Sequence, residues 1–457
     1  MNETKVGNAW FSPAMTNYSN RAFYNVYDAT DMLGAGNNVL SFLVGDGRYY
    51  EPIRERHRNE PCLIACLVVT CKNGTSLTLV SDSTWEWTTG PLRVGNFWMG
   101  ECWDKRMEPV DWKPVGLIDP PTENLVCQLM PPERVIRRIK PVRIYEPEPG
   151  VWVADFGQMV TGAVELKMAL PAGTIATLRY SAVVQGSPEE NVYYLQPHIS
   201  SSLYYQDPEI KRDADGMIAP FYASQGAKVG IDGKNAHAGT ACDVFVGDGQ
   251  ETNFHRRFGY AAFRYVEITG LQEAPSSESL TALLINTDLS RIGRFSCSDS
   301  LIQAIHKAGI RSVTQNTHGQ GQDNSARERC SYPTCLLYNA RLAAYEFDVA
   351  ALWRKTLADI RSSSSDPGST RLCPPDKSML APTRHDFPNS RSPMGEEIAT
   401  LSWESYVWYG DKEELQRNWP YIRHWAEYYW GDWFDNPDAQ DIYPVEKIRP
   451  AFWLTWG

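Results

Sequence analysis

The chain has 457 residues, a length that corresponds to about three domains rather than one. Lysine and arginine number 44 against 55 aspartate and glutamate residues, so the formal net charge is −11. A chain this acidic repels nucleic-acid phosphates, which argues against nucleic acid as a partner. No stretch approaches about eighteen uninterrupted apolar residues, so we expect no membrane span and no membrane partner.

Cysteine and histidine usage gives no sign of a metal centre. The ten cysteines include no C-x-x-C pair and no zinc spacing, and the eight histidines are dispersed. We therefore expect no metal and no cofactor. The cysteines are interpreted as reduced, buried thiols, which together with an N-terminus unlike a signal peptide favours a reducing compartment such as the cytoplasm.

Residues 1 to about 285 show strand-forming patterns separated by turn formers. Residues 62–71 and 77–80 flank Asn73-Gly74, which predicts a hairpin with a type I′ turn. The proline-rich stretch 131–147 is a candidate boundary between two β units, and the polar stretch 207–239 is a candidate surface excursion. Further strands are expected at 21–30, 38–44, 151–153, 163–168, 174–180 and 262–268.

The hydrophobic period changes near residue 296. Residues 296–299 offer helix caps, after which Leu301, Ile302 and Ile305 recur at helical spacing, and residues 336–360 and 412–429 continue the pattern. We expect a multidomain chain of two antiparallel β-sandwich-like domains followed by an all-α domain that closes as a barrel of helix pairs. The expected domains are residues 1–133, 134–287 and 288–457.

Tryptophan is concentrated in the helical part, where nine of the 16 lie between Trp353 and Trp456. One interpretation is an aromatic helical core, because large rings dominate core energetics. The other is a sugar-binding cleft, in which flat rings stack on pyranose faces. Composition does not choose between them.

One polar, charged segment lies between the first two expected helices and reads Gly-Gln-Asp-Asn-Ser-Ala-Arg-Glu-Arg-Cys over residues 321–330. Two flanking arginines favour the ionised form of Glu328. A proton-donating role therefore requires burial or a second carboxylate, such as Asp323, to raise its pKa. The alternative interpretation is a solvated ion-pair cluster without a catalytic role.

This segment resembles the D-x-x-x-R-E-R-x-G-W-x-G-D signature of bacterial α-L-rhamnosidases, glycoside hydrolase family 78. Other segments are similar to family motifs and occur in the family's order: Tyr27–Thr30, Gly100–Asp104, Asp155–Gln158 and Phe263–Glu267. Each motif is short. Their order along almost the whole chain is what identifies the resemblance.

The resemblance implies a rhamnosidase N-terminal-like β-sandwich, a concanavalin-like β-sandwich and part of an (α/α)6-barrel catalytic domain. It also implies hydrolysis of terminal α-L-rhamnosyl bonds with inversion, which needs two carboxyl groups about 6.5–9.5 Å apart. Carried over by position, Glu328 is the general acid, Asp323 and Arg327 bind the sugar, and Tyr332 stacks on it. The implied partner is a carbohydrate substrate, and a homodimer is left open.

The sequence also departs from the family pattern. Cys335 stands where the family has an aspartate, and similar losses of a family residue occur at Ser331, Ser390 and Thr455. Rhamnose specificity is therefore left open, and the alternative is a degenerate, non-catalytic carbohydrate-binding relative. A glycoside phosphorylase is a third reading that the lack of a phosphate-binding cluster disfavours.

Length sets a further expectation. A barrel of six helix pairs needs some 300 residues or more, whereas Phe295 to Gly457 is 163 residues. We expect a fragment truncated at both ends, inactive by itself, whose catalytic base lies beyond Gly457. The acids within the chain that could serve instead are simpler to read as exposed helix-face residues: Glu396, Glu397, Glu404 and Asp432.

Overall fold

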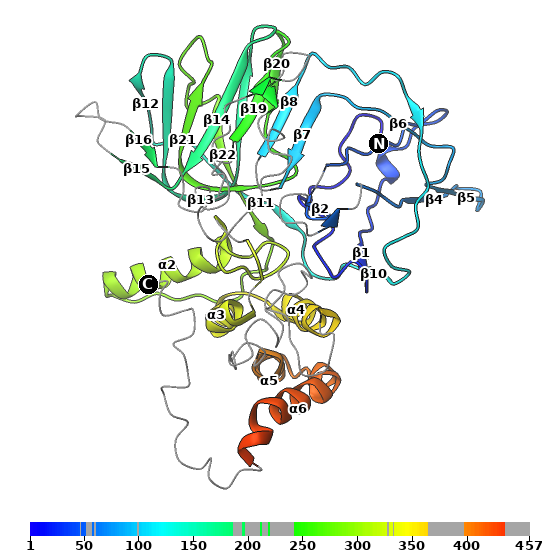
Figure 1. The fold of residues 1–457 in the computed structure, drawn as a ribbon, viewed down its shortest axis with the longest axis vertical. Coiled ribbons are helices and arrows are strands. Elements are labelled where there is room, and N and C mark those ends of the chain that lie inside the picture. Colours follow the sequence, from blue (N-terminus) through cyan, green and yellow to red (C-terminus); the bar gives the residue numbers. More distant parts are fainter. Residues whose placement is uncertain are drawn as a thin grey trace. The chain divides into compact units, whose positions relative to one another are not determined.

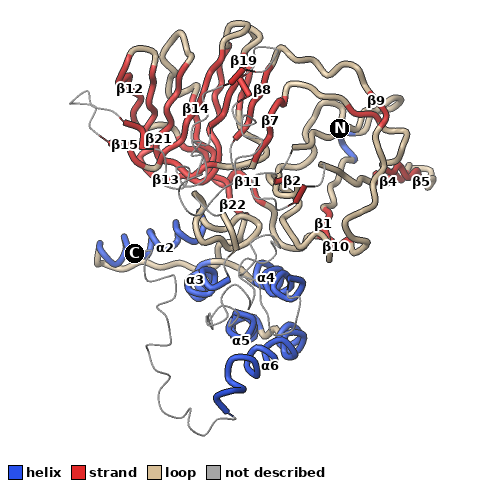
Figure 2. The backbone as a smooth tube through the Cα atoms, viewed as in Figure 1, coloured by secondary structure: helices blue, strands red, loops and turns tan. Residues whose placement is uncertain are grey.

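The computed structural model describes residues 1–45, 47–51, 57–58, 61–97, 100–185, 194–196, 211–212, 218–219, 242–326, 329–331, 333–363 and 397–434. The chain divides into two compact units. The first unit comprises Met1–Phe11, Val26–Pro121 and Arg134–Ile285, and the second comprises Ser12–Asn25, Thr122–Glu133 and Asn286–Gly457. The strands of the large sheet belong to the first unit and all five α-helices to the second (Figures 1 and 2).

A ten-stranded sheet dominates the first unit. Its main path runs β11-β22-β13-β21-β14-β19-β8-β7, and β12 and β20 pair with β13 beside that path. Figure 1 shows this sheet as a strongly curved layer. The strands are β7 (Leu92–Asn96), β8 (Gly100–Asp104), β11 (Glu133–Ile139), β12 (Arg143–Glu148), β13 (Val151–Ala169), β14 (Ile175–Ser181), β19 (Cys242–Val246), β20 (Glu251–Phe254), β21 (Ala261–Thr269) and β22 (Leu280–Thr287).

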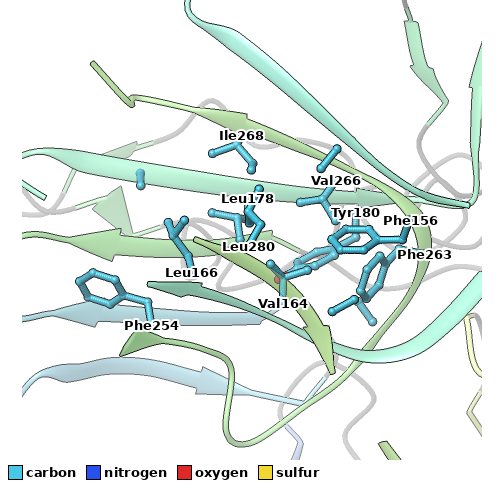
Figure 3. Packing of buried hydrophobic residues seen from close by; sticks show 14 of the residues in the cluster. Phe156, Val164, Leu166, Leu178, Tyr180, Phe254, Phe263, Val266, Ile268 and Leu280 are labelled. Atoms are coloured by element: carbon cyan, nitrogen blue, oxygen red, sulfur yellow. The ribbon is translucent and has the colours of Figure 1, made fainter. Parts of the chain in front are cut away.

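The core of this unit lies on the central strands, where apolar side chains of β13, β14, β21 and β22 meet (Figure 3). Phe263 of β21 packs edge-on against Phe156 of β13, with ring centroids 5.7 Å apart, and lies 5.1 Å from the ring of Tyr180. Aromatic pairs prefer such tilted and edge-to-face arrangements. The predicted strands at 151–153 and 163–168 are thus two parts of one long strand, and those at 174–180 and 262–268 are confirmed as β14 and β21.

Two-stranded pairs complete the described strands. The pairs are β1 (Ala22–Tyr24) with β10 (Leu125–Cys127), β2 (Tyr50–Glu51) with β3 (His57–Arg58), β4 (Cys66–Thr70) with β5 (Ser76–Val80), β6 (Glu86–Trp87) with β9 (Lys113–Pro114), β15 (Val183–Gln185) with β16 (Tyr194–Gln196), and β17 (Lys211–Arg212) with β18 (Ile218–Ala219). The predicted hairpin is confirmed as β4–β5, but its turn is not type I′. Only Gly74 has a positive φ, and its amide donates to the carbonyl of Cys71, as in a type I turn followed by a left-handed glycine.

Other expectations for the strand-rich part hold only in coarse form. Residues 21–30 contain the short strand β1, residues 38–44 form no regular element, and the proline-rich stretch 131–147 contains strand β11 and most of strand β12. Strands β7 and β8 lie within residues 1–133, the expected first domain. They nevertheless join the ten-stranded sheet, because β8 pairs with β19 and β7 pairs with β8. Most of the predicted excursion at 207–239 lies outside the described residues.

Polar residues of the Gly100–Asp104 motif are buried in a charge cluster. Asp243 of β19 accepts hydrogen bonds from the Glu101 amide and from Nε of Arg256, both at 2.9 Å. Glu101 accepts from Nη1 of Arg257 at 2.9 Å and from the Arg257 amide at 2.6 Å. Burial raises the pKa of Glu101 although the Arg257 charge acts in the opposite direction. The pairing ties the segment after β20 to β8 and β19.

A further ion pair joins two more motifs of the first unit. Arg264 donates from Nε and Nη2 to the two carboxylate oxygens of Asp155, at 2.8 and 2.9 Å. Burial alone raises the pKa of Asp155, but the hydrogen bonds from Arg264 and from the Gly157 amide outweigh it and hold the pKa below its ordinary value. The motifs Asp155–Gln158 and Phe263–Glu267 are therefore two halves of one cross-strand contact between β13 and β21.

Five helices form most of the described part of the second unit. Their core gathers Trp353, Leu357 and Ile360 with Ile398 and Leu401, all almost fully buried. Of the tryptophans, Trp353 fits the predicted aromatic core, whereas Trp403 and Trp419 are exposed. The helices are α2 (Ser300–Gln315), α3 (Pro333–Glu346), α4 (Ala350–Ser363), α5 (Glu397–Tyr409) and α6 (Lys412–Phe434).

The change of period near residue 296 is confirmed as the start of α2. Asp299 caps the helix, and its carboxylate accepts from the amides of Leu301 at 2.8 Å and Ile302 at 3.0 Å. Leu301 and Ile305, which mark the period, are 67% and 63% exposed. The predicted helical stretch 336–360 is divided in two, because the chain turns between α3 and α4.

Two segments from the N-terminal part of the chain belong to the second unit. Nδ2 of Asn17 donates to the carbonyl of Ser362 at 2.5 Å, and Nη2 of Arg21 lies 2.5 Å from Oδ1 of the buried Asp359. Strands β1 and β10 of these segments pair in parallel. These contacts hold the N-terminal segments on α4.

The cysteine expectation is wrong for half of the side chains that the structure describes. All eight are free thiols, as expected, but Cys62, Cys66, Cys71 and Cys297 are exposed, and only Cys102 and Cys330 are buried. Three of the exposed thiols lie in or beside the β4–β5 hairpin, whose side chains are mostly exposed.

Replacing Gly100 by alanine tests the close approach of β8 to β19. Gly100 has a φ of +121°, and a Cβ atom there would lie 1.9 Å from the carbonyl oxygen of Cys242. We expect Gly100→Ala to lower the free energy of unfolding by more than about 2 kcal/mol, measured by urea denaturation. The control is Gly116→Ala, where a Cβ meets nothing within 4 Å; equal stability of the two variants would contradict the described packing.

His255 predicts a pH dependence of the first unit. Burial, helped by the nearby charge of Arg257, lowers the pKa of His255 from 6.5 to about 4. The folded ring stays neutral while the unfolded ring takes up a proton below pH 6.5, so this contribution to stability is complete above that pH and is lost as the pH falls towards 4. Between these limits we expect the wild type to lose about 3 kcal/mol more than His255→Gln in urea unfolding; parallel losses would contradict the assignment.

Candidate functional site

The segment between α2 and α3, Asn316–Tyr332, is the candidate site. Loops usually run over the surface, because buried backbone groups need hydrogen-bond partners. Here the described residues are largely buried and polar: Thr317, His318, Gln320, Gln322, Ser325, Arg329 and Ser331. Part of the backbone pairs within the loop, since the His318 amide donates to the Gln320 carbonyl at 2.9 Å and the Gln322 amide to the Asn316 carbonyl at 2.8 Å.

The first half of the loop is anchored on residues distant in sequence. The Thr287 amide donates to the carbonyl of Thr317 at 2.9 Å, and the Gly319 amide donates to Oγ1 of Thr287 at 2.8 Å. A Cβ on Gly319 would lie 3.1 Å from Cβ of Ala14, so the N-terminal segment also packs here. The loop is thus held from outside the helices that flank it.

A buried histidine–carboxylate pair is the strongest of these anchors. Nδ1 of His318 lies 2.9 Å from Oε2 of Glu133, and Nε2 lies 3.1 Å from the carbonyl of Gln315. Because a carbonyl oxygen only accepts, Nε2 carries a proton. The contact with Glu133 requires a further proton, on Nδ1 or on the carboxylate. Both side chains are buried, so neither partner is compensated by water if the other is removed.

The second half of the loop closes on Asp323. The Asp323 amide donates to the carbonyl of Cys330 at 3.0 Å, and the Cys330 amide donates to Oδ1 of Asp323 at 3.1 Å. Asn324 donates from Nδ2 to Oδ2 of Asp323 at 2.8 Å. Arg329, next to Cys330, is buried and has a φ of +52°. Residues 323–330 therefore form a loop whose two ends are hydrogen-bonded to each other.

The structure describes one of the four predicted site residues. Asp323 lies in the closed loop, partly buried, whereas Arg327, Glu328 and Tyr332 lie outside the described residues. Among the departures from the family pattern, Ser331 is buried; Ser390 and Thr455 also lie outside the described residues, as does the side chain of Cys335.

The candidate alternative bases are not exposed helix-face acids where the structure describes them. Glu397 and Glu404 are both buried, which corrects that expectation. Glu404 accepts from Nε and Nη2 of Arg341 at 3.0 and 2.8 Å, and from Nε1 of Trp408 at 3.0 Å. An acid held in this way lacks the freedom to activate water. Glu396 and the side chain of Asp432 lie outside the described residues.

Sequence reasoning did not find His318, Glu133 or Arg329. Glu133 and His318 are separated by 185 positions, and neither belongs to a recognisable spacing. For Arg329, only its place in the R-E-R sequence was visible, and a positive φ is unusual for a residue with a Cβ. Gly319 and Gly321 beside His318 were the one available signal that the chain packs closely here.

Two findings on the described residues concern metal-binding clusters and membrane-spanning helices. None of their histidine, cysteine, aspartate and glutamate side chains gather in threes or more as a metal site would require. Over the same residues, every helix falls short of the length and apolar character needed to cross a membrane.

The His318–Glu133 pair predicts strong coupling. We expect His318→Ala and Glu133→Ala each to lower the free energy of unfolding of the second unit by about 3–5 kcal/mol, because each leaves a buried partner alone. The double variant should lose less than the sum of the two single losses. A double-mutant cycle in urea measures this, and additive losses would show that the two side chains do not depend on each other.

Comparison with known families covers nearly the whole chain. The α-L-rhamnosidase N-terminal domain matches residues 1–146, the bacterial α-L-rhamnosidase concanavalin-like domain matches 145–286, and the bacterial α-L-rhamnosidase 6 hairpin glycosidase domain matches 290–441. Among curated relatives, an α-L-rhamnosidase of Formosa agariphila is 25% identical over 499 residues, covering 100% of this chain and 49% of that protein. One of Streptomyces avermitilis is 25% identical over 483 residues, covering 99% and 42%.

Solved structures agree with the sequence comparison. The α-L-rhamnosidase of Dictyoglumus thermophilum superposes with a TM-score of 0.75 at 25% identity, over 93% of this chain and 44% of that one. The Streptomyces avermitilis enzyme, solved in complex with L-rhamnose, gives 0.74 at 25% identity, over 93% and 38%. The chain spans about half the length of the curated relatives it matches. With three rhamnosidase domains matched in succession, this chain belongs to the bacterial α-L-rhamnosidase family.

Proposed function

We propose that the whole protein is an inverting glycoside hydrolase that releases terminal α-L-rhamnose from glycosides or polysaccharides. The observation that carries the proposal is the hydrogen-bonded closure between Asp323 and Cys330, beside the buried Ser325 and Arg329, in a chain that matches the rhamnosidase 6 hairpin glycosidase domain. The Streptomyces avermitilis relative is an α-L-rhamnosidase solved with L-rhamnose, which supports that sugar as the substrate group.

In this proposal Glu328 is the general acid that protonates the leaving oxygen. Asp323 and Arg327 hold sugar hydroxyls, Arg327 through its rigid fork of donors, and Tyr332 stacks on the ring. The described flanks of the acid support this role, because Ser325 and Arg329 are buried and a sheltered site raises the pKa of a carboxylic acid. Hydrolysis with inversion further requires a second carboxylate, about 6.5–9.5 Å away, to activate water.

We also propose that the helices are part of an (α/α)6 barrel and that the base is none of the ion-paired acids among the described residues. Three buried acids of the described helices support this, since cationic side chains already bind them. Asp359 pairs with Arg21 and Lys355, Glu404 with Arg341, and Glu414 with Arg361 and Arg417. The chain alone is then expected to bind the sugar without hydrolysing the bond, whereas the whole protein turns it over.

Glu328→Gln tests the acid. In the whole protein we expect it to lower kcat by about 10²–10⁴-fold on an alkyl α-L-rhamnoside, whose leaving oxygen must be protonated. A dinitrophenyl α-L-rhamnoside has a leaving group that departs without a proton, so its kcat should change little. The proton NMR spectrum of the first product should show the β anomer, as inversion requires.

The matched control is Glu413→Gln, an exposed acid in the first turn of α6, which should keep wild-type kinetics. Equal losses on both substrates would remove Glu328 from the acid role. A wild type that binds L-rhamnose but hydrolyses no rhamnoside would favour the degenerate carbohydrate-binding relative instead. A homodimer stays a prediction, which sedimentation can address.

A further inference from the structure

We infer that Asp323 is a positioning residue, whose carboxylate closes the loop that contains Arg327 and Glu328. The inference rests on the proposed function of Glu328 and adds a role to Asp323 beyond contact with a sugar. A residue that only binds substrate leaves its carboxylate open towards the site. Asp323 instead uses one carboxylate oxygen on the backbone of its own loop.

The closure consists of two hydrogen bonds between the same two residues. The Asp323 amide donates to the Cys330 carbonyl at 3.0 Å, while the Cys330 amide donates to Oδ1 of Asp323 at 3.1 Å. The second bond has a carboxylate oxygen as its acceptor, and hydrogen bonds to ionised carboxylates are stronger than bonds between neutral groups. Cys330 is buried, so water does not compete for its amide.

Asn324 fixes the orientation of that carboxylate. Its Nδ2 donates to Oδ2 of Asp323 at 2.8 Å, and its Oδ1 accepts from the Ala326 amide at 3.1 Å. The Asn324 side chain therefore connects the carboxylate to the backbone further along the loop. With both oxygens of Asp323 engaged, rotation of its carboxylate would break two contacts.

The backbone beside the closure is in a conformation that needs external support. Arg329 has a φ of +52°, where a residue with a Cβ is disfavoured, and such a conformation persists only if the surroundings determine it. The hydrogen bond on the next amide, that of Cys330, supplies this constraint. Because consecutive Cα atoms are about 3.8 Å apart, the Cα atom of Glu328 is tied to Arg329.

A general acid accelerates the reaction most when its position relative to the leaving oxygen is fixed in advance, since misplacement by about 1 Å costs up to about 10²-fold in rate. The closure joins Asp323 and Cys330, which lie on either side of Arg327 and Glu328 in the sequence. Opening the closure should therefore lower kcat. It should also loosen the loop in the absence of any sugar.

Two variants separate closure from contact with the sugar. Asp323→Ala removes the acceptor, whereas Asp323→Asn keeps an oxygen for the Cys330 amide and removes the charge. Hydrogen–deuterium exchange of peptides covering residues 323–331 is measured in this chain without ligand. We expect exchange at the Cys330 amide to rise about tenfold or more in Asp323→Ala and to change by less than about threefold in Asp323→Asn.

Alkylation of Cys330, read by peptide mass spectrometry, gives a second measure. The thiol is buried in the closed loop and should react faster only in Asp323→Ala. The matched control is Asp348→Ala, which removes a carboxylate that accepts from the Ala350 amide at the start of α4. That control should leave both readouts at the loop unchanged. If amide exchange and alkylation of Cys330 proceed in Asp323→Ala at the same rates as in the wild type, the inference is overturned.

Kinetics of the whole protein complete the test. Closure predicts that kcat falls further in Asp323→Ala than in Asp323→Asn, because the alanine variant loses the acceptor of the Cys330 amide as well as the sugar contact. If the two variants lose equal kcat while the loop of Asp323→Asn stays protected, the carboxylate acts on the sugar alone and positioning is overturned. A wild type without rhamnosidase activity contradicts the proposed function, and the exchange data then decide the closure by themselves.

Discussion

A charge that leaves water must find a partner, and this constraint organises both units of the chain. In the first unit Asp243 and Arg256 are fully buried and bonded to each other, and Glu101 is bonded to Arg257. In the second unit the His318–Glu133 pair has the same character. Removing one member of such a pair strands the other, whereas removing both costs much less. The pairs Glu101–Arg257 and His318–Glu133 also join segments far apart in sequence, so these two pairs determine which segments meet as well as how strongly they hold.

The coarse order of strands followed by helices was predictable from the sequence, because periodicity and turn residues are local signals. The hairpin at β4–β5, strand β21, the two ends of β13 and the Asp299 cap all follow from such signals. The placement of β7 and β8 did not, because their partner β19 lies about 140 positions later and the contact depends on the buried bonds of Glu101 and Asp243. Likewise, nothing local shows that Ser12–Asn25 belongs with α4, since the reason is the pairing of Arg21 with Asp359.

The short motifs that suggested the family have structural explanations in the described residues. The Gly100–Asp104 motif needs a glycine because β8 approaches Cys242 closely, and it needs a glutamate to bind the Arg257 backbone. The pair Asp155 and Arg264 explains two motifs at once. Short motifs of this kind reflect contacts that stabilise the fold. The residues of the proposed chemistry had to be inferred from one loop, and its anchors, His318 and Glu133, carried no sequence signal because a pair formed by folding has no fixed spacing.

The loop between α2 and α3 is long for a connection between neighbouring helices, 17 residues from Asn316 to Tyr332. A loop of that length with buried polar groups is costly unless every group is bonded, so its persistence needs a reason beyond connection. A helix would satisfy its own backbone, but it would also fix its side chains along one axis. A loop held at Thr287, at Glu133 and across Asp323–Cys330 is instead anchored by contacts outside either helix. For proton donation this is the better arrangement, because the donor has to match the position of a departing oxygen rather than the direction of a helix.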